Sequence, residues 1–161
     1  MAVTSAGILL YRLVEDGAVE VFIAHMGGPF WASKDDGAWS IPKGEFVEGD
    51  EAALDAARRE FAEELGVDAP DIQYAELGTF AYSSGKRVTV FVADGAAFEH
   101  THFEYGEFEL EWPPRSGKVK RFPEMERAEW FALDHARQMI LPSQAPLLGA
   151  LEAALDDPGQ G

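Results

Sequence analysis

Three glutamates on one face of a predicted helix are the residues of this sequence with the clearest chemical potential. Glu60, Glu63 and Glu64 lie within five consecutive positions. Because successive residues of a helix advance by about 100°, Glu64 lies about 40° to one side of Glu60 and Glu63 about 60° to the other. Like charges at this spacing destabilise an isolated helix by ~0.2–0.5 kcal/mol, and a hard divalent cation such as Mg²⁺ or Mn²⁺ offsets the repulsion. The stripe is therefore compatible with a metal site, but a solvated acidic face is the commoner use of such a pattern taken alone, so the flanking sequence has to decide.

The segment that carries these glutamates is predicted to be a helix over residues Glu51–Leu65. Asp50 is a suitable N-cap residue, and Gly66 suits a left-handed cap at the C-terminal end. Apolar residues recur at helical spacing and form the stripe expected to face the core: Leu54, Ala57, Phe61 and Leu65.

Strand-like runs precede and follow this helix, and further helices lie near the C-terminus. The strand-like runs are Val3–Val14, Val19–His25, Ile72–Tyr82, Arg87–Ala93, Phe103–Trp112 and Ala128–Leu133. Residues 26–49 form a long segment that we expect to be irregular but packed. Helices are expected over Asp134–Ile140 and over Gln144–Leu155, the second capped by Ser143. This order predicts an α+β fold, a mixed sheet flanked by helices, with one domain over residues 1–155 and a disordered tail over 156–161.

The composition excludes several classes of protein. The chain has 161 residues, and its 13 Lys and Arg against 29 Asp and Glu give a net charge of −16. It therefore lacks the basic footprint expected for nucleic-acid binding or for docking on an anionic membrane. It has no cysteine, so disulfides and thiolate sites are excluded. No apolar run approaches a membrane span, and no secretory signal is visible, so we expect a cytoplasmic monomer or homodimer acting on a small molecule.

The residues around the three glutamates resemble the Nudix box, a glycine, five residues, a glutamate, seven residues and then Arg-Glu-apolar-any-Glu-Glu-any-Gly-apolar. Residues 59–67 match the second half without a departure. The first half has one residue more than usual, since six residues separate Gly44 from Glu51, which we interpret as the first glutamate. Residues 39–44 resemble the approach to the box, residues 5–12 the first strand of the family, and residues 124–133 its closing segment. The resemblance thus covers nearly the whole chain.

This resemblance implies a Nudix α/β/α sandwich and a Mg²⁺-dependent pyrophosphohydrolase, with Mn²⁺ as an alternative cofactor. Such an enzyme cleaves a phosphoanhydride bond in a nucleoside diphosphate linked to another group, by attack of a metal-activated water. The implied metal ligands are the backbone carbonyl of Gly44 and the carboxylates of Glu60, Glu63 and Glu64. Of these residues, Glu63 and Glu64 are also catalytic candidates, together with Arg59.

The resemblance also implies two kinds of supporting carboxylate. Glu51 is expected to act with Arg59 in orienting the metal-binding glutamates. A further carboxylate outside the box is often the general base or an additional metal ligand in this family. Glu124, which follows Pro123, is our candidate for that role, and the alternatives are Glu126 and Glu109.

Candidate substrate-binding residues lie beside the box. Lys43 is the first cation that an anionic nucleotide would meet on this acidic chain, with Lys86 and Arg87 as further candidates. The rings of Trp39 and Tyr82 are candidates for stacking on a base, and packing in the core is the alternative use of such rings.

The substrate stays open among diadenosine polyphosphates, (deoxy)nucleoside triphosphates and nucleotide sugars. The Pro-Lys-Gly approach to the box and the first strand resemble diadenosine polyphosphate hydrolases. ADP-ribose is disfavoured because Tyr82 and Ser83 stand near the place where ADP-ribose hydrolases of the family carry a proline. The alternative function is a non-catalytic Nudix-like nucleotide-binding or regulatory module, although such modules usually lose box glutamates that this chain keeps.

Overall fold

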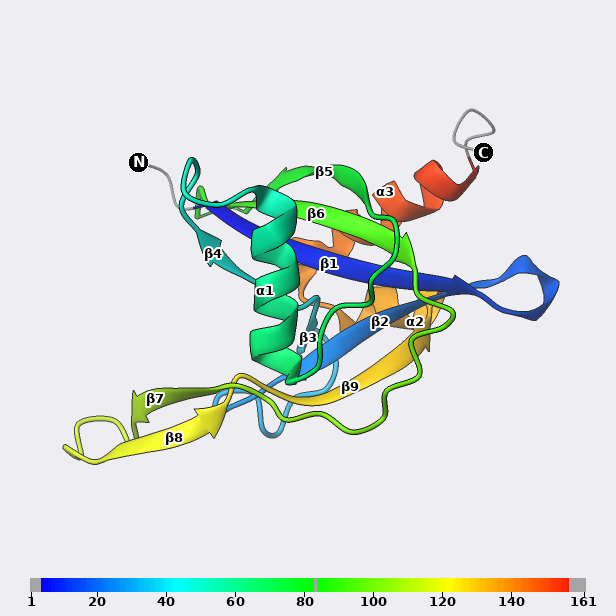
Figure 1. Ribbon diagram of the computed structural model, residues 1–161. Helices are drawn as coiled ribbons and strands as arrows, with labels where there is room; N and C mark the ends of the chain where they lie inside the picture. The colour runs from blue at the N-terminus through cyan, green and yellow to red at the C-terminus, as the bar shows by residue number, and fades with distance from the viewer. Residues whose placement is uncertain (1–3, 83, 157–161) are drawn as a thin grey trace.

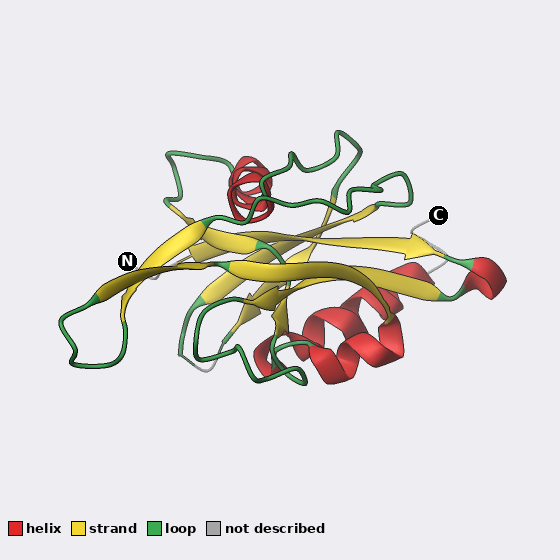
Figure 2. Ribbon diagram, turned by 90° about the horizontal axis from the view of Figure 1, so that it is seen from below, coloured by secondary structure: helices red, strands yellow, loops and turns green. Residues whose placement is uncertain are grey.

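Helices cover both faces of one mixed sheet in this protein, whose computed structural model describes residues 4–82 and 84–156. Figure 2 shows helix α1 (Ala53–Leu65) on one face and helices α2 (Leu133–Met139) and α3 (Ala145–Asp156) on the other. This arrangement confirms the predicted α+β class. Within the described ranges, no helix is long and apolar enough to cross a membrane.

The main sheet is built around a strand that serves two sets of partners. Its strands are β1 (Thr4–Leu13), β2 (Val19–Met26), β3 (Trp39–Ser40), β4 (Lys43–Phe46), β5 (Ala75–Ala81), β6 (Arg87–Asp94) and β9 (Met125–Ala132). The order is β3-β2-β1-β6-β5, with β4 paired to β1 and β9 paired to β2 (Figure 1). The first residues of β1 pair with β4 and the last with β2, both antiparallel, while β6 runs parallel to β1. Because α1 packs against both β1 and β4, this pairing brings β4 to the helix that carries the glutamates.

A two-stranded arm projects from this body. Strands β7 (Glu107–Glu111) and β8 (Val119–Pro123) pair only with each other, as a separate antiparallel sheet seen at the lower left of Figure 1. Two short 3₁₀ helices complete the elements, at Glu15–Gly17 after β1 and at Pro142–Gln144 before α3.

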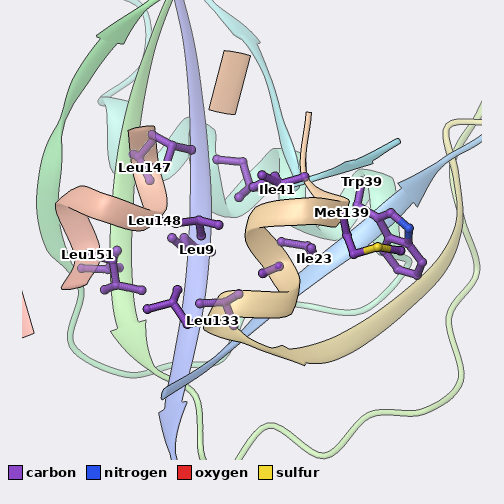
Figure 3. Close-up of a cluster of buried hydrophobic side chains, with 14 of the residues drawn as sticks. Leu9, Ile23, Trp39, Ile41, Leu133, Met139, Leu147, Leu148 and Leu151 are labelled. Atoms are coloured by element: carbon purple, nitrogen blue, oxygen red, sulfur yellow. The ribbon is translucent and has the colours of Figure 1, made fainter. Parts of the chain in front are cut away.

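The two faces of the sheet each bury their own hydrophobic cluster. Because side chains alternate along a strand, Leu9 of β1 points to α2 and α3, while Ile8 and Leu10 point to α1. Figure 3 shows the first cluster, in which Leu9, Ile23, Trp39 and the leucines of α3 meet. On the other side, Phe61 and Leu65 of α1 are fully buried, at ~1.5–3 kcal/mol of stabilisation per side chain. This fixes the rotation of α1 and leaves its glutamates on the flank beside β4.

Helix α1 begins later than its sequence pattern predicts. Its N-cap is Ala52, and no side chain caps its first turn, so the expectation that Asp50 caps it is wrong. Residue Glu51 lies outside the helix, where it forms an ion pair with Arg59. The C-terminal prediction is confirmed, because Gly66 has a φ of 72° and its N–H donates to the Ala62 carbonyl.

Three other predictions need correction. The segment predicted to be irregular contains β3 and β4, because backbone partners in β2 and β1, outside this local stretch, complete them. The expected strand Phe103–Trp112 is regular only over β7, and its partner β8 was not predicted, since it follows the turn-like residues 113–118. Ser143 is not a cap, as it lies within the second 3₁₀ helix, ahead of α3. Of the predicted tail, only Asp156 lies within the described residues, and it ends α3.

Candidate active site

Helix α1 and strand β4 meet where Gly44 lies against the carboxylate of Glu60. A Cβ added to Gly44 would overlap this carboxylate, so a larger residue would force the Glu60 side chain to move. Burial raises the pKa of Glu60, and a hydrogen bond from Arg59 opposes that shift. The charges of Glu63 and Glu124 raise it further. The structure thus brings together two of the predicted metal ligands, Gly44 and Glu60.

Glu64 carries a largely buried carboxylate that contacts the start of β4. The backbone N–H of Lys43 donates a hydrogen bond to its Oε2 atom at 3.3 Å. Burial raises the pKa of Glu64 to about 8, against the lowering effects of the Lys43 charge and of that hydrogen bond. The charges of Glu124 and Glu60 raise it further. The ionised form of this carboxylate is therefore disfavoured, and a bound cation would stabilise it.

Arg59 links the loop before α1 to the helix. Its Nε and Nη2 atoms donate to the two carboxylate oxygens of Glu51 at 2.9 and 3.0 Å, a two-point contact that lowers the pKa of Glu51. Its Nη1 atom donates to Glu60 at 2.8 Å and to Glu63 at 3.3 Å. The geometry places Glu51, rather than Asp50, in contact with Arg59, as the interpretation of the enlarged box loop expects.

Carboxylates outnumber cations at this junction, although they do not yet form a closed ligand set. In the part of the chain that the structure describes, no three acidic or histidine side chains stand together as ready ligands of one ion. Two of the predicted ligands, Glu60 and Glu63, are instead paired with Arg59. The oxygen donors, the glycine cradle and the uncompensated charge fit a hard divalent cation, and the side chain of Glu63, which is 58% exposed, is free to turn from Arg59 towards it.

Backbone hydrogen bonds hold Glu124 close to the cluster of Glu60 and Glu64. The N–H of Gly106 donates to the Glu64 carbonyl at 3.2 Å, and the N–H of Glu124 donates to the Gly106 carbonyl at 2.6 Å. From the other side, the N–H of Gly27 donates to the Glu124 carbonyl at 2.9 Å. The Glu124 charge raises the pKa of both Glu60 and Glu64, as expected of a carboxylate close to them.

The two alternatives to Glu124 lie elsewhere. Glu126 is the extra residue of a bulge in β9, and its Oε1 atom lies 2.8 Å from Nδ1 of the fully buried His25. Glu109 lies on the projecting arm, opposite Arg121 in the β7–β8 register. Of the three carboxylates, only Glu124 acts on the pKa values of the helix glutamates in the described structure.

The three predicted substrate-binding residues have different surroundings. The Lys43 ammonium lies 6.0 Å from the ring centroid of Tyr82, so these two residues are neighbours, although the Tyr82 ring also packs against the cluster beneath α3. Tyr82 is half-buried, and its hydroxyl accepts a 3.4 Å hydrogen bond from Gln144. Trp39 is only 1% exposed, and its ring packs edge-on against Phe131 in the core. The expectation that Trp39 stacks on a base is therefore wrong, because no face of its ring reaches solvent.

Sequence reasoning missed two buried polar residues that shape this region. Gln144 is fully buried, and its Oε1 atom accepts a hydrogen bond from the Ile41 N–H at 3.0 Å, which holds the loop before β4. His25 lies in an otherwise apolar run and anchors the bulge next to Glu124. A polar residue inside a strongly apolar strand was the only available signal for His25, and Gln144 gave none beyond its place before a leucine-rich helix.

One family model matches nearly the whole chain. The family model described as NUDIX domain matches residues 4–151. An uncharacterised 17.7 kDa protein of Enterobacteria phage T4, from the e-segB intergenic region, is 39% identical over 93 residues, which span 56% of this chain and only 58% of that relative.

Two solved structures share the fold. A C. elegans Ap4A hydrolase in a binary complex has a TM-score of 0.60 at 22% identity, covering 96% of this chain and 98% of that one. The NUDIX domain of Shewanella oneidensis NrtR, complexed with ADP ribose, has a TM-score of 0.62 at 16% identity, covering 96% and 89%. With the family model matched from the first strand to the last helix, the chain belongs to the NUDIX domain family.

Proposed function

We propose that this protein is a Mg²⁺-dependent pyrophosphohydrolase that cleaves a phosphoanhydride bond in a nucleoside diphosphate linked to another group. The observation that carries this proposal is the uncompensated carboxylate cluster at the junction of α1, β4 and Glu124. Burial and neighbouring charge raise the pKa values of Glu60 and Glu64. A divalent cation is the simplest partner for such a cluster, and Mn²⁺ is an alternative to Mg²⁺. The proposal places the protein in the cytoplasm as a monomer or homodimer.

The residues divide between holding the ion and acting on the substrate. Glu60, Glu63 and Glu64 and the Gly44 carbonyl would hold the metal. When bound, Mg²⁺ supplies positive charge to the phosphoryl oxygens and activates a water. Glu124, which is not committed to another side chain by any hydrogen bond found in the described residues, would take the proton from that water. Arg59, held by Glu51, would fix the orientation of the helix carboxylates.

The surroundings of Lys43 support a substrate with both phosphates and a base. The Lys43 ammonium offers a cation for a phosphate on an otherwise acidic surface, and the ring of Tyr82 lies beside it. A base stacked on Tyr82 would therefore have its phosphates directed to Lys43 and the carboxylates. Diadenosine polyphosphates and (deoxy)nucleoside triphosphates both fit this order of groups.

A second candidate is a nucleotide-binding module without turnover. Arg59 forms ion pairs with Glu60 and Glu63 in this structure, which would hold part of the cluster together without a metal. The similar NUDIX domain of NrtR was solved with ADP ribose.

Release of phosphate, pyrophosphate or nucleoside monophosphate over a panel of nucleotides distinguishes the two. We expect hydrolysis of at least one dinucleoside polyphosphate or triphosphate with Mg²⁺, and none with EDTA. Glu15→Gln is the control for substitutions of the site glutamates. It lies at an exposed position in the 3₁₀ helix after β1 and should hydrolyse at the wild-type rate. Nucleotide binding by calorimetry without any release would support the module and contradict the enzyme.

A further inference from the structure

The β7–β8 arm has no part in the proposed hydrolysis, yet its base is tied to the candidate active site. Gly106, just before β7, bonds to the backbone of Glu64, and Glu124 follows β8 directly. Within the described chain, the arm pairs with no other strand (Figure 1), although an isolated two-stranded hairpin is at best marginally stable in water. An arm kept in this state next to a site is a candidate binding surface.

The register divides the arm into two chemically different faces. Phe108 pairs with Phe122 and Leu110 with Lys120, and the Trp112 N–H donates to the Lys118 carbonyl, which extends the pairing by one step. Because side chains alternate, six residues share what we call the aromatic face: Phe108, Leu110, Trp112, Lys118, Lys120 and Phe122. The opposite face, which we call the acidic face, carries Glu107, Glu109, Glu111, Val119, Arg121 and Pro123.

The loop after β2 packs against the aromatic face and leaves its rings partly exposed. Gly28 lies against the ring of Phe108, and the ring of Phe30 meets Trp112 edge-on at 5.4 Å between centroids. Phe30 is nevertheless 59% exposed, and Trp112 is partly exposed. The same loop holds the Glu124 carbonyl through Gly27, so the aromatic face and the carboxylate cluster are fixed relative to each other.

The charges on the arm are segregated in the same way. Residues 115–121 contain four of the 13 Lys and Arg of the chain and no Asp or Glu. Lys118 and Lys120 are exposed on the aromatic face, whereas all three glutamates of the arm lie on the acidic face, where Arg121 pairs with Glu107 at 3.6 Å. Cations interleaved with partly exposed aromatic rings are the combination that binds single-stranded nucleic acids without sequence preference. The net charge of −16 argues against nucleic-acid binding over the body of the protein. The aromatic face, however, carries two lysines and no acidic residue.

The length of the arm selects a ligand longer than one nucleotide. At about 3.4 Å per residue, Trp112 lies about 17 Å along the arm from Glu107. A mononucleotide whose phosphates lie at the carboxylates does not span this distance, whereas a strand of several nucleotides does. We propose that the aromatic face binds a single-stranded nucleic acid whose 5′ phosphates point to the carboxylate cluster; the direction of the strand rests on the proposed function, and the binding itself does not.

Fluorescence anisotropy tests the binding without any chemistry. The probe is a 12-nucleotide oligouridine with a 5′ phosphate and a 3′ fluorophore, titrated with the protein in EDTA at low salt. We expect saturable binding. The logarithm of the association constant should fall linearly with the logarithm of the salt concentration, with a slope of about −0.7 for each phosphate contacted, or about −1.4 if each of the two lysines contacts one phosphate.

Two neighbouring residues provide a matched pair of charge reversals. Lys120→Glu and Arg121→Glu change the net charge equally, but they lie on the aromatic face and the acidic face respectively. We expect Lys120→Glu to weaken binding about tenfold and Arg121→Glu less than about twofold, because only the first reverses a charge facing the strand. Equal losses would overturn the proposal, since they would show a response to overall charge alone.

A second pair tests the stacking. Trp112→Leu should weaken binding about fivefold or more by removing a ring on which a base stacks. Val119→Ala, at an apolar position that is 64% exposed on the acidic face, should leave the affinity unchanged. Circular dichroism checks that both variants fold, and if Trp112→Leu does not fold, the charge reversals decide the question alone.

The remaining outcomes separate this inference from the proposed hydrolysis. Absence of binding by the wild-type protein at 100 µM overturns the inference even if nucleotides are hydrolysed (roughly the upper range for non-specific binding). Binding of the oligonucleotide without hydrolysis of any nucleotide sustains it and contradicts the proposed function. Sedimentation of the wild type as a dimer and of Lys120→Glu as a monomer would show that the face is an interface between two copies, which also overturns it.

Discussion

Gln144 and Glu64 hold neighbouring parts of the same short segment from opposite sides of the sheet. Gln144 precedes α3 and accepts a hydrogen bond from the Ile41 N–H at 3.0 Å. Glu64, on α1, accepts one from the Lys43 N–H at 3.3 Å. The amide of Gln144 also donates to the Ser40 hydroxyl at 2.8 Å, so it is fully paired while fully buried. The carboxylate of Glu64 instead faces two more carboxylates.

The contrast separates a polar group that stabilises the fold from one that is available for chemistry. A buried neutral amide with all its partners satisfied contributes modestly to stability and makes the segment rigid. A buried carboxylate among like charges is destabilising until a cation arrives, and such groups are characteristic of functional sites. Substitutions at the two positions should therefore have opposite consequences for activity and for stability.

Glu64→Gln should have the largest effect on activity, a loss of about 10³-fold in kcat/KM with Mg²⁺, because an amide is a poor ligand for a hard cation. Glu63→Gln should lose activity by orders of magnitude as well. Both variants should keep the circular dichroism spectrum of the wild type. Near-wild-type rates in both at saturating Mg²⁺ would contradict the metal assignment.

The same Glu64→Gln substitution should stabilise the metal-free protein at high pH. Burial raises the pKa of Glu64 to about 8, so the folded protein keeps a proton that the unfolded chain loses near its ordinary value of 4.5. The contribution of the protonated group to stability is therefore complete below pH 4.5 and is lost as the pH rises through about 8. Thermal unfolding in EDTA should show the variant gaining about 4 kcal/mol on the wild type between pH 5 and pH 9. A difference in Tm that does not change with pH would contradict the environment assigned to Glu64.

Glu124 and Glu126 both lie outside α1, and substitutions at the two positions test which of these carboxylates takes part in catalysis. Glu124→Gln should lower kcat about 10²-fold while Mg²⁺ affinity is retained, as expected for loss of a general base. Glu126→Gln is the matched control, because Glu126 lies against His25 instead of the helix glutamates and an amide of the same size keeps that packing. We expect it to change kcat by less than about threefold. A larger loss in Glu126→Gln than in Glu124→Gln would show that the wrong carboxylate has been chosen.

Gln144→Leu should act on stability instead. It leaves the Ile41 N–H and the Ser40 hydroxyl buried near an apolar side chain, at a cost of about 1–3 kcal/mol in the free energy of unfolding. Gln138→Leu is the control, since Gln138 is exposed and its bond to Asp36 lies at the surface. Denaturant unfolding measures both, and kcat should be unchanged in either. Loss of kcat in Gln144→Leu without loss of stability would contradict the assignment of Gln144 to fold stability.

The sequence predicts the features that depend on neighbouring residues. The spacing of Phe61, Leu65 and the glutamates predicts both faces of α1, and Gly66 predicts its end. The same local pattern predicts a cap at Asp50, which is wrong, because it does not show that α1 begins after Ala52 and that Glu51 pairs with Arg59. These features need only a few residues of context on either side.

The rest of the site depends on partners far along the chain. Trp39 next to the box reads equally well as core or as a stacking ring, and only its contact with Phe131 decides between them. Gln144 is 103 residues from the Ile41 N–H that it binds, and Glu124 reaches the helix through Gly106. No local pattern encodes these pairings, because they follow from the packing of the sheet.

Tyr82 is next to both Gln144 and Lys43, so substitutions there test whether its ring belongs to the core or to the candidate site. Their expected effects are the smallest of the series. The Tyr82 hydroxyl belongs to the network of Gln144, whereas its ring lies 6.0 Å from the Lys43 ammonium. If the ring stacks on a base, Tyr82→Ala should raise KM by about tenfold with little change in kcat.

Tyr82→Phe keeps the ring and removes only the 3.4 Å hydrogen bond, so it should retain the wild-type KM and lose at most about 1 kcal/mol of stability. Steady-state kinetics and thermal unfolding of both variants measure the two contributions separately. A lowered Tm with an unchanged KM in Tyr82→Ala would assign the ring to the hydrophobic core, on the side of Gln144. The proposed site would then need another group to bind the base, while the proposed contact of Lys43 with a phosphate would stand.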